Sequence, residues 1–126
     1  MTTSNTDWDI DNNRPVFIQI MEIIQNRIAS GFYAPGEKIP SVREIAAEAT
    51  VNPNTVQRSL LELERTELLL SKRAIGRFVT EDESIIAQTR SQLAIKIVDA
   101  FFEGMTGLGF SKQEAIAMLD ERGGEL

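Results

Sequence analysis

Cysteine and histidine are both absent from this chain of 126 residues. Without cysteine there is no disulfide framework and no thiolate metal site, and most zinc sites draw on these two residue types. The lack of histidine also removes the commonest general base and every Ser–His or Cys–His nucleophile pair. The carboxylates are scattered, and there is no glycine-rich phosphate loop. We therefore expect a protein that is not an enzyme and that has no metal and no cofactor.

Long apolar runs are missing as well. No stretch approaches the roughly 20 residues that a membrane span requires. The polar, acidic start of the chain, residues 1–10, does not have the pattern of a signal peptide. We therefore expect a cytoplasmic protein that does not contact membranes.

An excess of positive charge is also lacking, because the net charge is −6 at pH 7. This argues at first sight against DNA binding, which needs a basic face for phosphates. The charges are unevenly distributed, however. Residues 38–77 contain 7 Lys and Arg against 5 Asp and Glu, a net of +2, whereas residues 82–126 contain 4 against 8. The acidity should weaken non-specific DNA binding without forbidding specific binding.

Apolar periodicity and capping signals predict three helices in the first half of the chain. The first begins at Pro15 and carries one apolar stripe at spacings of three and four residues. The second begins at the capping box of Ser41 and Glu44. The third begins at Asn52, a favourable N-cap that is followed by proline, and extends to about residue 66.

A β-hairpin is predicted to follow these helices. Residues 68–70 and 76–80 are typical of two short strands, and a basic turn at 72–75 joins them. The polar break after the second strand predicts a boundary between residues 1–81 and 82–126. The expected fold is mainly α with a small β-hairpin wing, a winged helix-turn-helix plus a two-helix C-terminal dimerisation segment.

The C-terminal segment is predicted to contain a helix over 84–102, a glycine loop over 104–109, and a last helix. A second capping box, Ser111 with Glu114, begins that last helix, and Gly123-Gly124 ends it.

From residue 93 to residue 102 the sequence is apolar almost all round the helix, so it must be buried on more than one side. It could form intrachain core, line a small-molecule pocket, or join a second chain. Two helices cannot cover it alone, and about 45 residues supply little wall for a pocket. We favour a symmetric homodimer. The expected interface residues are Leu93, Ile97, Phe101 and Phe102.

Two short helices joined by a tight turn meet the geometric requirement for reading the major groove of DNA. The third helix opens with side chains that can hydrogen-bond base edges, namely Asn52, Asn54, Thr55, Gln57 and Arg58. The alternative is that the asparagines are only caps and the other side chains a solvated face. Arg43 in the second helix suits a phosphate or a guanine, or else a surface ion pair. Lys72, Arg73 and Arg77 around Gly76 suit phosphates or the minor groove, or else an ordinary solvated turn.

Several spaced motifs follow one another over about residues 14–80. In chain order they are Pro15-Val-Phe-x-Gln19-Ile20, Gly31-x-x-x-Pro35-Gly36-x-Lys-Ile39-Pro40-Ser41-Val-Arg43-x-Ile45-Ala46, Val51-Asn-Pro-Asn-Thr55-Val56 and Gly76-x-Phe78-Val79. Together these motifs resemble the GntR family of bacterial repressors. The short C-terminal segment further resembles the YtrA-like subfamily, which has two helices there instead of a full effector-binding domain.

The resemblance implies DNA contacts from the second and third helices and from the wing. The candidate DNA-binding residues are Ser41, Arg43, Asn52, Asn54, Thr55, Gln57, Arg58, Lys72, Gly76 and Arg77. Two residues depart from the family pattern, because Glu67 and Ala74 stand where the family usually has glycine. Only glycine takes a positive φ freely, so these departures bear on the geometry of the wing.

The predicted function is a sequence-specific DNA-binding transcriptional regulator. The resemblance implies a repressor, and two recognition helices in a homodimer predict an inverted-repeat operator. An unknown small-molecule effector is a possible further partner. The alternative is a winged-helix module that binds a basic protein and does not read DNA. Against it stands the asparagine-rich start of the third helix, where an interaction surface would favour aromatic or aliphatic anchors.

Overall fold

A computed structural model describes residues 8–125 of the chain. The start of the chain, on which the expectation of no signal peptide rests in part, falls largely outside the described residues. The chain divides into two compact units, residues 1–90 and 91–126, which are described separately below. The predicted division of function after residue 81 stays a prediction.

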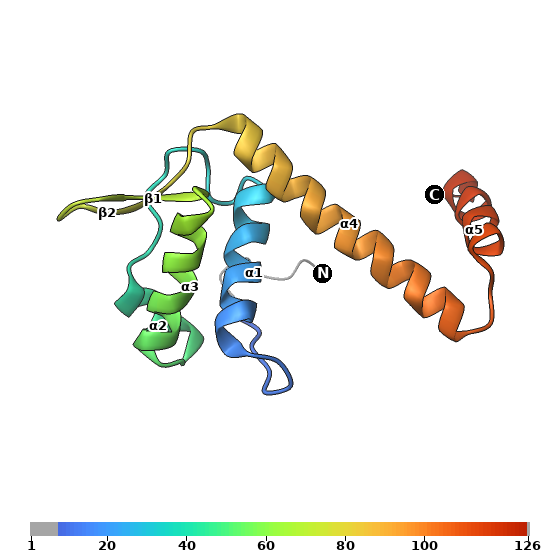
Figure 1. Ribbon diagram of the computed structural model, residues 1–126, viewed down its shortest axis with the longest axis horizontal. Helices are drawn as coiled ribbons and strands as arrows, with labels where there is room; N and C mark the ends of the chain where they lie inside the picture. The colour runs from blue at the N-terminus through green and yellow to red at the C-terminus, as the bar shows by residue number, and fades with distance from the viewer. Residues whose placement is uncertain (1–7, 126) are drawn as a thin grey trace. The chain divides into compact units, whose positions relative to one another are not determined.

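The first unit contains three helices followed by a two-stranded antiparallel hairpin, which confirms the predicted order (Figure 1). Its elements are α1 (Val16–Ala29), α2 (Val42–Ala49), α3 (Pro53–Arg65), β1 (Leu69–Lys72), β2 (Gly76–Val79) and the start of α4 (Glu83–Gly107). This is the mainly α architecture with a hairpin wing that the sequence predicts.

The predicted capping signals are formed where the sequence places them. At α2 the Ser41 hydroxyl accepts the Glu44 N–H at 3.2 Å, and the Glu44 carboxylate accepts the Ser41 N–H at 2.8 Å. At α3 the Asn52 side chain accepts the Asn54 N–H at 2.7 Å, and Pro53 takes the first helical position. Each cap satisfies backbone donors that the first helical turn would otherwise leave without partners.

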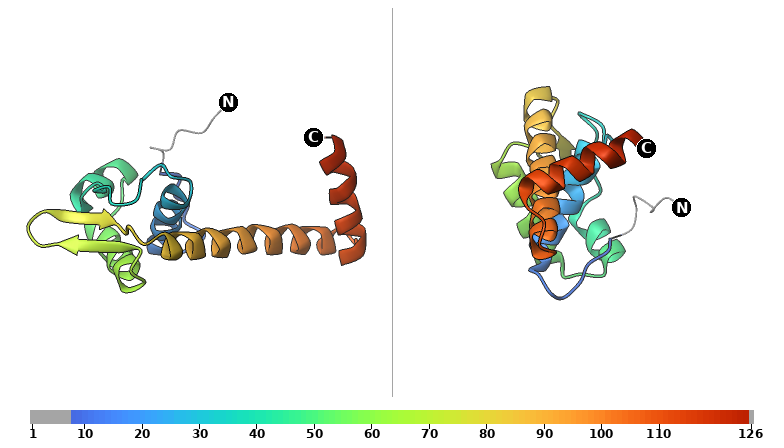
Figure 2. Two further views of the ribbon diagram at one scale, coloured as in Figure 1. Left: turned by 90° about the horizontal axis from the view of Figure 1, so that it is seen from above. Right: turned by 90° about the vertical axis from the view of Figure 1, so that its right-hand side faces the viewer.

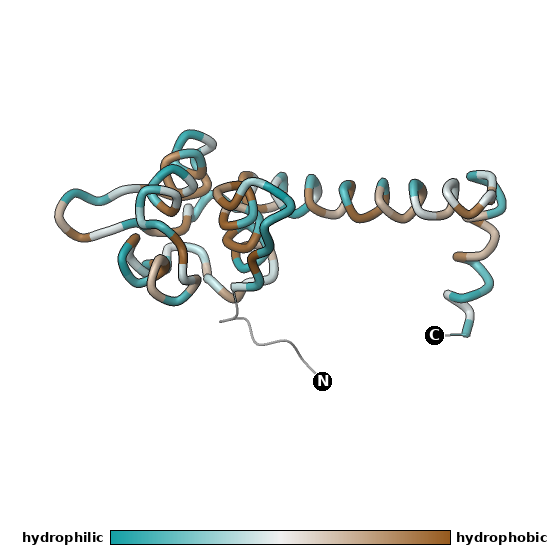
Figure 3. The backbone as a smooth tube through the Cα atoms, turned by 90° about the horizontal axis from the view of Figure 1, so that it is seen from below, coloured by the Kyte–Doolittle hydropathy of each residue, from teal (hydrophilic) through white to brown (hydrophobic). Residues whose placement is uncertain are grey.

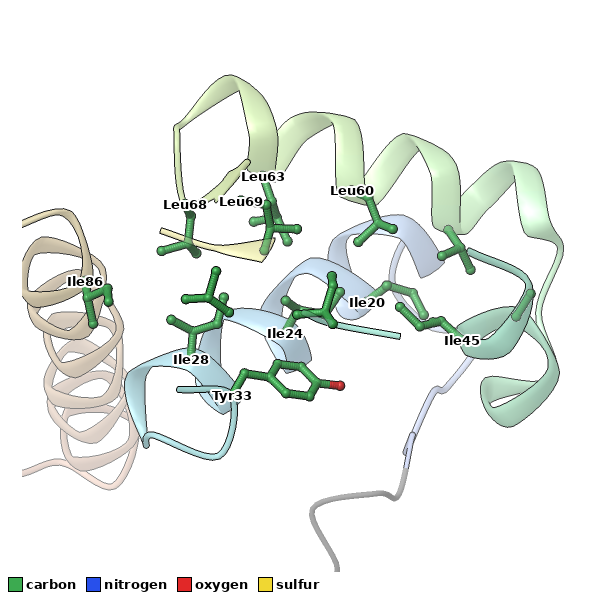
Figure 4. Packing of buried hydrophobic residues seen from close by; sticks show 14 residues of the cluster. Ile20, Ile24, Ile28, Tyr33, Ile45, Leu60, Leu63, Leu68, Leu69 and Ile86 are labelled. Carbon is green, nitrogen blue, oxygen red and sulfur yellow. The ribbon is translucent and has the colours of Figure 1, made fainter. Parts of the chain in front are cut away.

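The hydrophobic core of this unit lies between α1 and α3, and Figure 4 shows their apolar side chains pointing toward one another. Ile20 and Ile24 from α1 and Leu60 and Leu63 from α3 are all fully buried. Full burial of such a side chain contributes about 1.5–3 kcal/mol each. Ile86 in the first turns of α4 joins the same cluster. This packing holds α3 rigidly and presents its opposite side to solvent.

The hairpin extends away from the helices of its unit (Figure 2). Its strands pair from Leu69 opposite Val79 to Lys72 opposite Gly76. The segment before α2 adds a bridge on the other edge of β2, where Lys38 pairs with Phe78. The Ile39 N–H donates to the Arg77 carbonyl at 3.0 Å. The wing is therefore joined to the residues immediately before α2.

Both departures from the family's glycine pattern have a positive φ, which is 66° for Glu67 and 66° for Ala74. Glu67 lies just beyond the C-terminus of α3. Its N–H donates to Glu64 and the next N–H, of Leu68, donates to Leu63, which together make a Schellman motif. Both turns thus have the backbone conformation for which glycine is suited, although a residue with a Cβ atom is sterically strained there.

The second unit contains the remainder of α4 and α5 (Lys112–Glu125), and it corrects two sequence predictions. The predicted loop over 104–109 is wrong in its first part, because α4 continues to Gly107. Gly109, two residues beyond the end of α4, has a φ of 96° and forms a second Schellman motif, in which the Phe110 N–H donates to the Met105 carbonyl. Gly104 and Gly107 lie within the helix, and neither has a positive φ.

The predicted end of the last helix at Gly123-Gly124 is also wrong, since α5 continues to Glu125 and neither glycine has a positive φ. The start of α5 is as predicted. The Ser111 N–H donates to the Glu114 carboxylate at 2.8 Å, and the Glu114 N–H donates to the Ser111 hydroxyl at 3.1 Å.

Apolar residues recur along the second half of α4, where Figure 3 shows hydrophobic and hydrophilic positions alternating. Several are largely exposed, including Ile95 (58%) and Ile97 (69%). Leu93 is partly buried, and the rings of Phe101 and Phe102 contact each other with centroids 5.3 Å apart. Ala115 is buried on α5, but Ile116 and Leu119 are exposed. Within residues 91–125 the two helices therefore leave much of their apolar surface uncovered.

Candidate nucleic-acid interface

The turn between α2 and α3 sets the relation of the two helices. Thr50, the C-cap of α2, has a φ of 57° and ψ of 52°, the left-handed conformation. The next N–H, of Val51, donates back to the Ala46 carbonyl at 3.1 Å. The chain reverses within three residues, and α3 begins immediately afterwards. Buried Ile45 and Val56 join the same core cluster, so α2 and α3 are held as one body.

The first turns of α3 present a polar group of side chains to solvent. Asn54 and Gln57 are exposed, and Thr55 is partly buried. Asn52 has a double role, because its side-chain oxygen caps the helix while its amide N–H₂ group keeps both hydrogens for other acceptors. An asparagine amide or a glutamine amide can pair bidentately with adenine. The capping interpretation of Asn52 is thus correct without excluding a contact to a base.

The first turn of α2 adds Ser41 and Arg43 to this surface. Arg43 is exposed. The Ser41 hydroxyl accepts a hydrogen bond from the Glu44 N–H in the capping box. Hydrogen bonds from the backbone and the side chain of Ser41 lower the pKa of Glu44. The carboxylate therefore stays ionised and engaged with the cap.

The wing carries three predicted cationic residues, which differ in their surroundings. Lys72 lies with its ammonium 4.4 Å from the ring centroid of Phe78, and Arg73 is exposed in the turn. Arg77 is instead paired with Glu64 of α3, with Nε and Oε1 2.6 Å apart and both side chains mostly shielded from solvent. The pair ties the wing to α3. A DNA contact by Arg77 stays a prediction, and it would use the donors that Glu64 leaves.

Gly76 has a φ of 139° and lies against Lys38. A Cβ atom at position 76 would come within 2.8 Å of the Lys38 Cε. The conformation therefore favours glycine, and a Cβ atom there would displace the flexible end of the Lys38 side chain. The lysine side chain lies against the wing next to its turn, a placement that the sequence did not indicate. Its only sequence signal is its place in the motif that follows Gly36.

A groove of about 460 Å³ separates the wing from the start of α2 and from Gln57 of α3. Most of the charged side chains in its wall are basic. The charged and hydroxyl-bearing lining residues are Lys38, Ser41, Glu44, Ser71, Lys72, Arg73 and Arg77. The groove thus brings Ser41, Lys72, Gly76 and Arg77, which the sequence predicted separately, to one place. A cationic groove with hydroxyl donors has the chemistry that contacts phosphodiester groups.

Arg58 occupies the other side of α3. Its guanidinium carbon lies 3.6 Å from the ring centroid of Phe17, which belongs to α1. The two residues line a shallow depression of about 470 Å³ together with Asn54, Gln57, Leu61 and Glu62. The sequence analysis assigned Phe17 only to the apolar stripe and missed this contact.

Two further findings bear on the kind of site. Among residues 8–125 there is no group of three or more His, Cys, Asp or Glu side chains placed to hold a metal ion. In that same part of the chain, no helix has the length and apolar character needed to cross a membrane.

Comparison with known proteins gives a consistent result. The model of the bacterial regulatory proteins of the gntR family matches residues 18–79. The chain is 34% identical to YhcF of Bacillus subtilis, an uncharacterised transcriptional regulator of the helix-turn-helix type, over 87% of this chain and 91% of that protein. It is 32% identical to the transcriptional repressor YtrA of the same species, over 77% of this chain and 79% of YtrA.

Solved structures agree with these relatives. A GntR family transcriptional regulator from Listeria monocytogenes superposes with a TM-score of 0.80 at 37% identity, covering 89% of this chain and 98% of that one. The DNA-binding domain of AraR in complex with an operator superposes with a TM-score of 0.53 at 25% identity, covering 59% of this chain and 98% of that one.

Proposed function

The chain belongs to the gntR family of bacterial regulatory proteins and is a winged-helix transcriptional regulator, and from this premise we propose that it is a repressor that binds an inverted-repeat operator as a homodimer. The observation that carries the proposal is the polar surface on α2 and the start of α3, with Arg43, Asn54 and Gln57 all exposed beside a basic groove.

Each part of this surface has a separate task in the proposal. The start of α3 enters the major groove, where Asn54 and Gln57 read adenine edges and Thr55 packs against a thymine methyl. Arg43 and the cationic groove contact the sugar–phosphate backbone and set the register of the protein on the duplex. The turn of the wing, at Arg73, lies along the flanking backbone or minor groove.

The exposed apolar side chains of the second unit support the homodimer. Ile97 is 69% exposed, and Ile95, Val98 and Leu119 are each about half exposed or more. Large exposed apolar patches mark interaction sites in proteins that are otherwise well packed. The second half of α4 contains the predicted interface residues Leu93, Ile97, Phe101 and Phe102. A two-fold dimer places two recognition helices on half-sites about one DNA turn apart.

Repression follows from occupancy, because a dimer on an operator that overlaps a promoter blocks the polymerase. The relatives' names support this sign of regulation, since YtrA is a repressor. In this proposal the protein acts on the chromosome in the cytoplasm and needs no catalytic activity. An effector that changes the separation of the two DNA-binding units would relieve repression.

The test is a gel mobility shift on the DNA immediately upstream of the gene, at physiological salt with excess random competitor. We compare the wild type with the Arg43→Ala, Asn54→Ala double variant. The control is Arg122→Ala, which removes one equal charge from an exposed surface pair on α5. We expect a competitor-resistant shift that the double variant loses and the control keeps.

If no shift appears, a panel of inverted repeats is tested next. Failure on these as well would contradict the proposal, and the protein-interaction module would then be the better hypothesis. A shift that random competitor abolishes would contradict sequence reading while leaving non-specific DNA binding.

A further inference from the structure

The contact between Arg58 and Phe17 joins a candidate DNA-binding side chain to a helix outside the helix-turn-helix. Phe17 lies in the first turn of α1, and Arg58 lies one turn beyond Asn54 on the exposed side of α3. The guanidinium carbon is 3.6 Å from the ring centroid, well within the range of about 6 Å for a cation–π interaction.

The position of the ring relative to α3 is fixed by a buried hydrogen bond. The Ser59 hydroxyl, fully buried, lies 2.8 Å from the Phe17 carbonyl oxygen, to which it can donate, and 3.0 Å from the Thr55 carbonyl oxygen. The residue next to Arg58 therefore binds the backbone of the residue that supplies the ring. The backbones that carry the ring and the guanidinium are thus held in register.

Glu62, the acidic residue nearest to Arg58 in sequence, forms its ion pair with another arginine. Glu62 lies one turn farther along α3, at the spacing of a helical ion pair, but its carboxylate binds Arg65 at 3.1 Å and 3.3 Å. Contact with an aromatic ring holds a guanidinium through electrostatic attraction and does not consume its N–H donors. Arg58 is thus immobilised with hydrogen-bonding capacity left for another molecule.

We propose that Phe17 is a positioning residue for DNA recognition, which holds the Arg58 guanidinium in place to donate its planar set of N–H groups to the operator. The inference rests on the proposed function. The other contribution of α1 is to the core, through Ile20, Ile24 and Ile28.

The physical reason is the entropy of the arginine side chain. A free arginine loses about 2 kcal/mol of rotamer freedom when it is fixed on a partner, so a residue that fixes it beforehand lowers the cost of binding. A cation–π interaction at an exposed site contributes about 0.5–1 kcal/mol, which corresponds to an affinity change of about two- to fivefold.

The experiment is a double-mutant cycle on operator affinity. The probe is the DNA fragment that the wild type shifts, titrated by fluorescence anisotropy against random DNA of equal length. The proteins are the full-length wild type, Phe17→Leu, Arg58→Ala and the double variant. We expect Arg58→Ala to weaken operator binding at least about fivefold, in the range of an arginine–base contact. Phe17→Leu should weaken binding about two- to fivefold in the wild type and have no effect in the Arg58→Ala background.

Phe17→Tyr and Phe17→Trp are the conservative controls. Both keep an aromatic ring over the guanidinium and should restore binding to within about twofold of the wild type if the ring is what matters. Melting curves of every variant show which proteins are folded at the assay temperature. If Phe17→Leu is not folded there, Phe17→Met takes its place in the cycle.

The outcomes separate the two proposals. An equal loss from Phe17→Leu in both backgrounds would mean that the residue acts only through the fold, and it would overturn the inference while leaving operator binding intact. Full binding by Arg58→Ala would also overturn it. Failure of the wild type to bind any operator removes the proposed function, and this inference with it.

Discussion

Replacing Glu67 by glycine should stabilise the protein, because this residue occupies the left-handed position of the Schellman motif that ends α3. Its φ is 66°, and the hydrogen bonds from Glu67 N–H to Glu64 and from Leu68 N–H to Leu63 define the motif. The conformation costs an L-residue roughly 1–2 kcal/mol, whereas glycine adopts it freely.

The net gain is smaller than that cost. Glycine loses about 0.5–1 kcal/mol more conformational entropy on folding than alanine does. The difference leaves an expected increase in the free energy of unfolding of about 0.5–1 kcal/mol for Glu67→Gly. The negative charge of Glu67 also lies beside a helix C-terminus, where it opposes the helix dipole, so its removal acts in the same direction.

Glu67→Ala separates these two causes. It removes the charge but keeps the β-carbon, so it should recover only the small dipole contribution, about 0.3 kcal/mol. Ala87→Gly, at an exposed position inside α4, is the control of opposite sign and should lose about 1 kcal/mol. Substitution by glycine is therefore expected to raise the free energy of unfolding at residue 67, where φ is positive, and to lower it at residue 87, inside a helix.

The measurement is thermal and urea denaturation followed by circular dichroism, with all variants at one protein concentration because dimerisation shifts apparent stability. A gain of 1 kcal/mol raises Tm by about 4–8 °C for a domain of this size. If Glu67→Ala stabilises as much as Glu67→Gly, the argument from backbone conformation is refuted. A loss of stability in Glu67→Gly would refute it as well.

Three further predictions concern the wing, the second unit and pH. Gly76→Ala should weaken operator binding in gel-shift titrations, because alanine is strained at a φ of 139° and its Cβ would displace the Lys38 side chain from the wing; unchanged affinity would contradict this requirement for glycine. Ile97→Glu should yield monomers in analytical ultracentrifugation while circular dichroism stays helical, since a charge at a dimer interface cannot be buried unpaired; a persistent dimer would place the interface elsewhere. Glu44 contributes stability above its unfolded pKa and loses it as pH falls through its lowered folded pKa. Glu44→Gln should abolish that part of the acid dependence of Tm, and an unchanged pH profile would count against the capping box.

Several features of the fold were predictable because their causes lie within four residues of chain. The capping boxes at Ser41 and Ser111 and the Asn52–Pro53 start of α3 all form as predicted, since each depends on side chains three residues apart or fewer. The apolar stripe of α1 likewise follows from helical spacing alone. The winged helix-turn-helix then follows from the order of these elements.

The glycine-rich segments show where this local reasoning fails. Gly104 and Gly109 are both glycines in the segment that the sequence predicts as a loop. The helix α4 nevertheless continues through Gly104, and it ends two residues before Gly109, which has a positive φ. What distinguishes them is the pair of backbone hydrogen bonds that closes the motif at Gly109, and residue type alone does not specify those bonds. Conversely, Glu67 adopts a positive φ next to buried Leu68, and Ala74 adopts one in the exposed turn of the wing, where the Ile75 N–H donates to the Lys72 carbonyl.

The sequence by itself determined which side chains are available to read DNA and on which helices they lie. Only the tertiary structure decided what each one contacts within the protein. It places Arg77 on Glu64, 13 residues earlier in the chain, and Arg58 on Phe17 of α1. It also brings Lys38 against Gly76. Contacts of this kind depend on how the helices dock through their cores, and no local spacing of residues encodes that geometry.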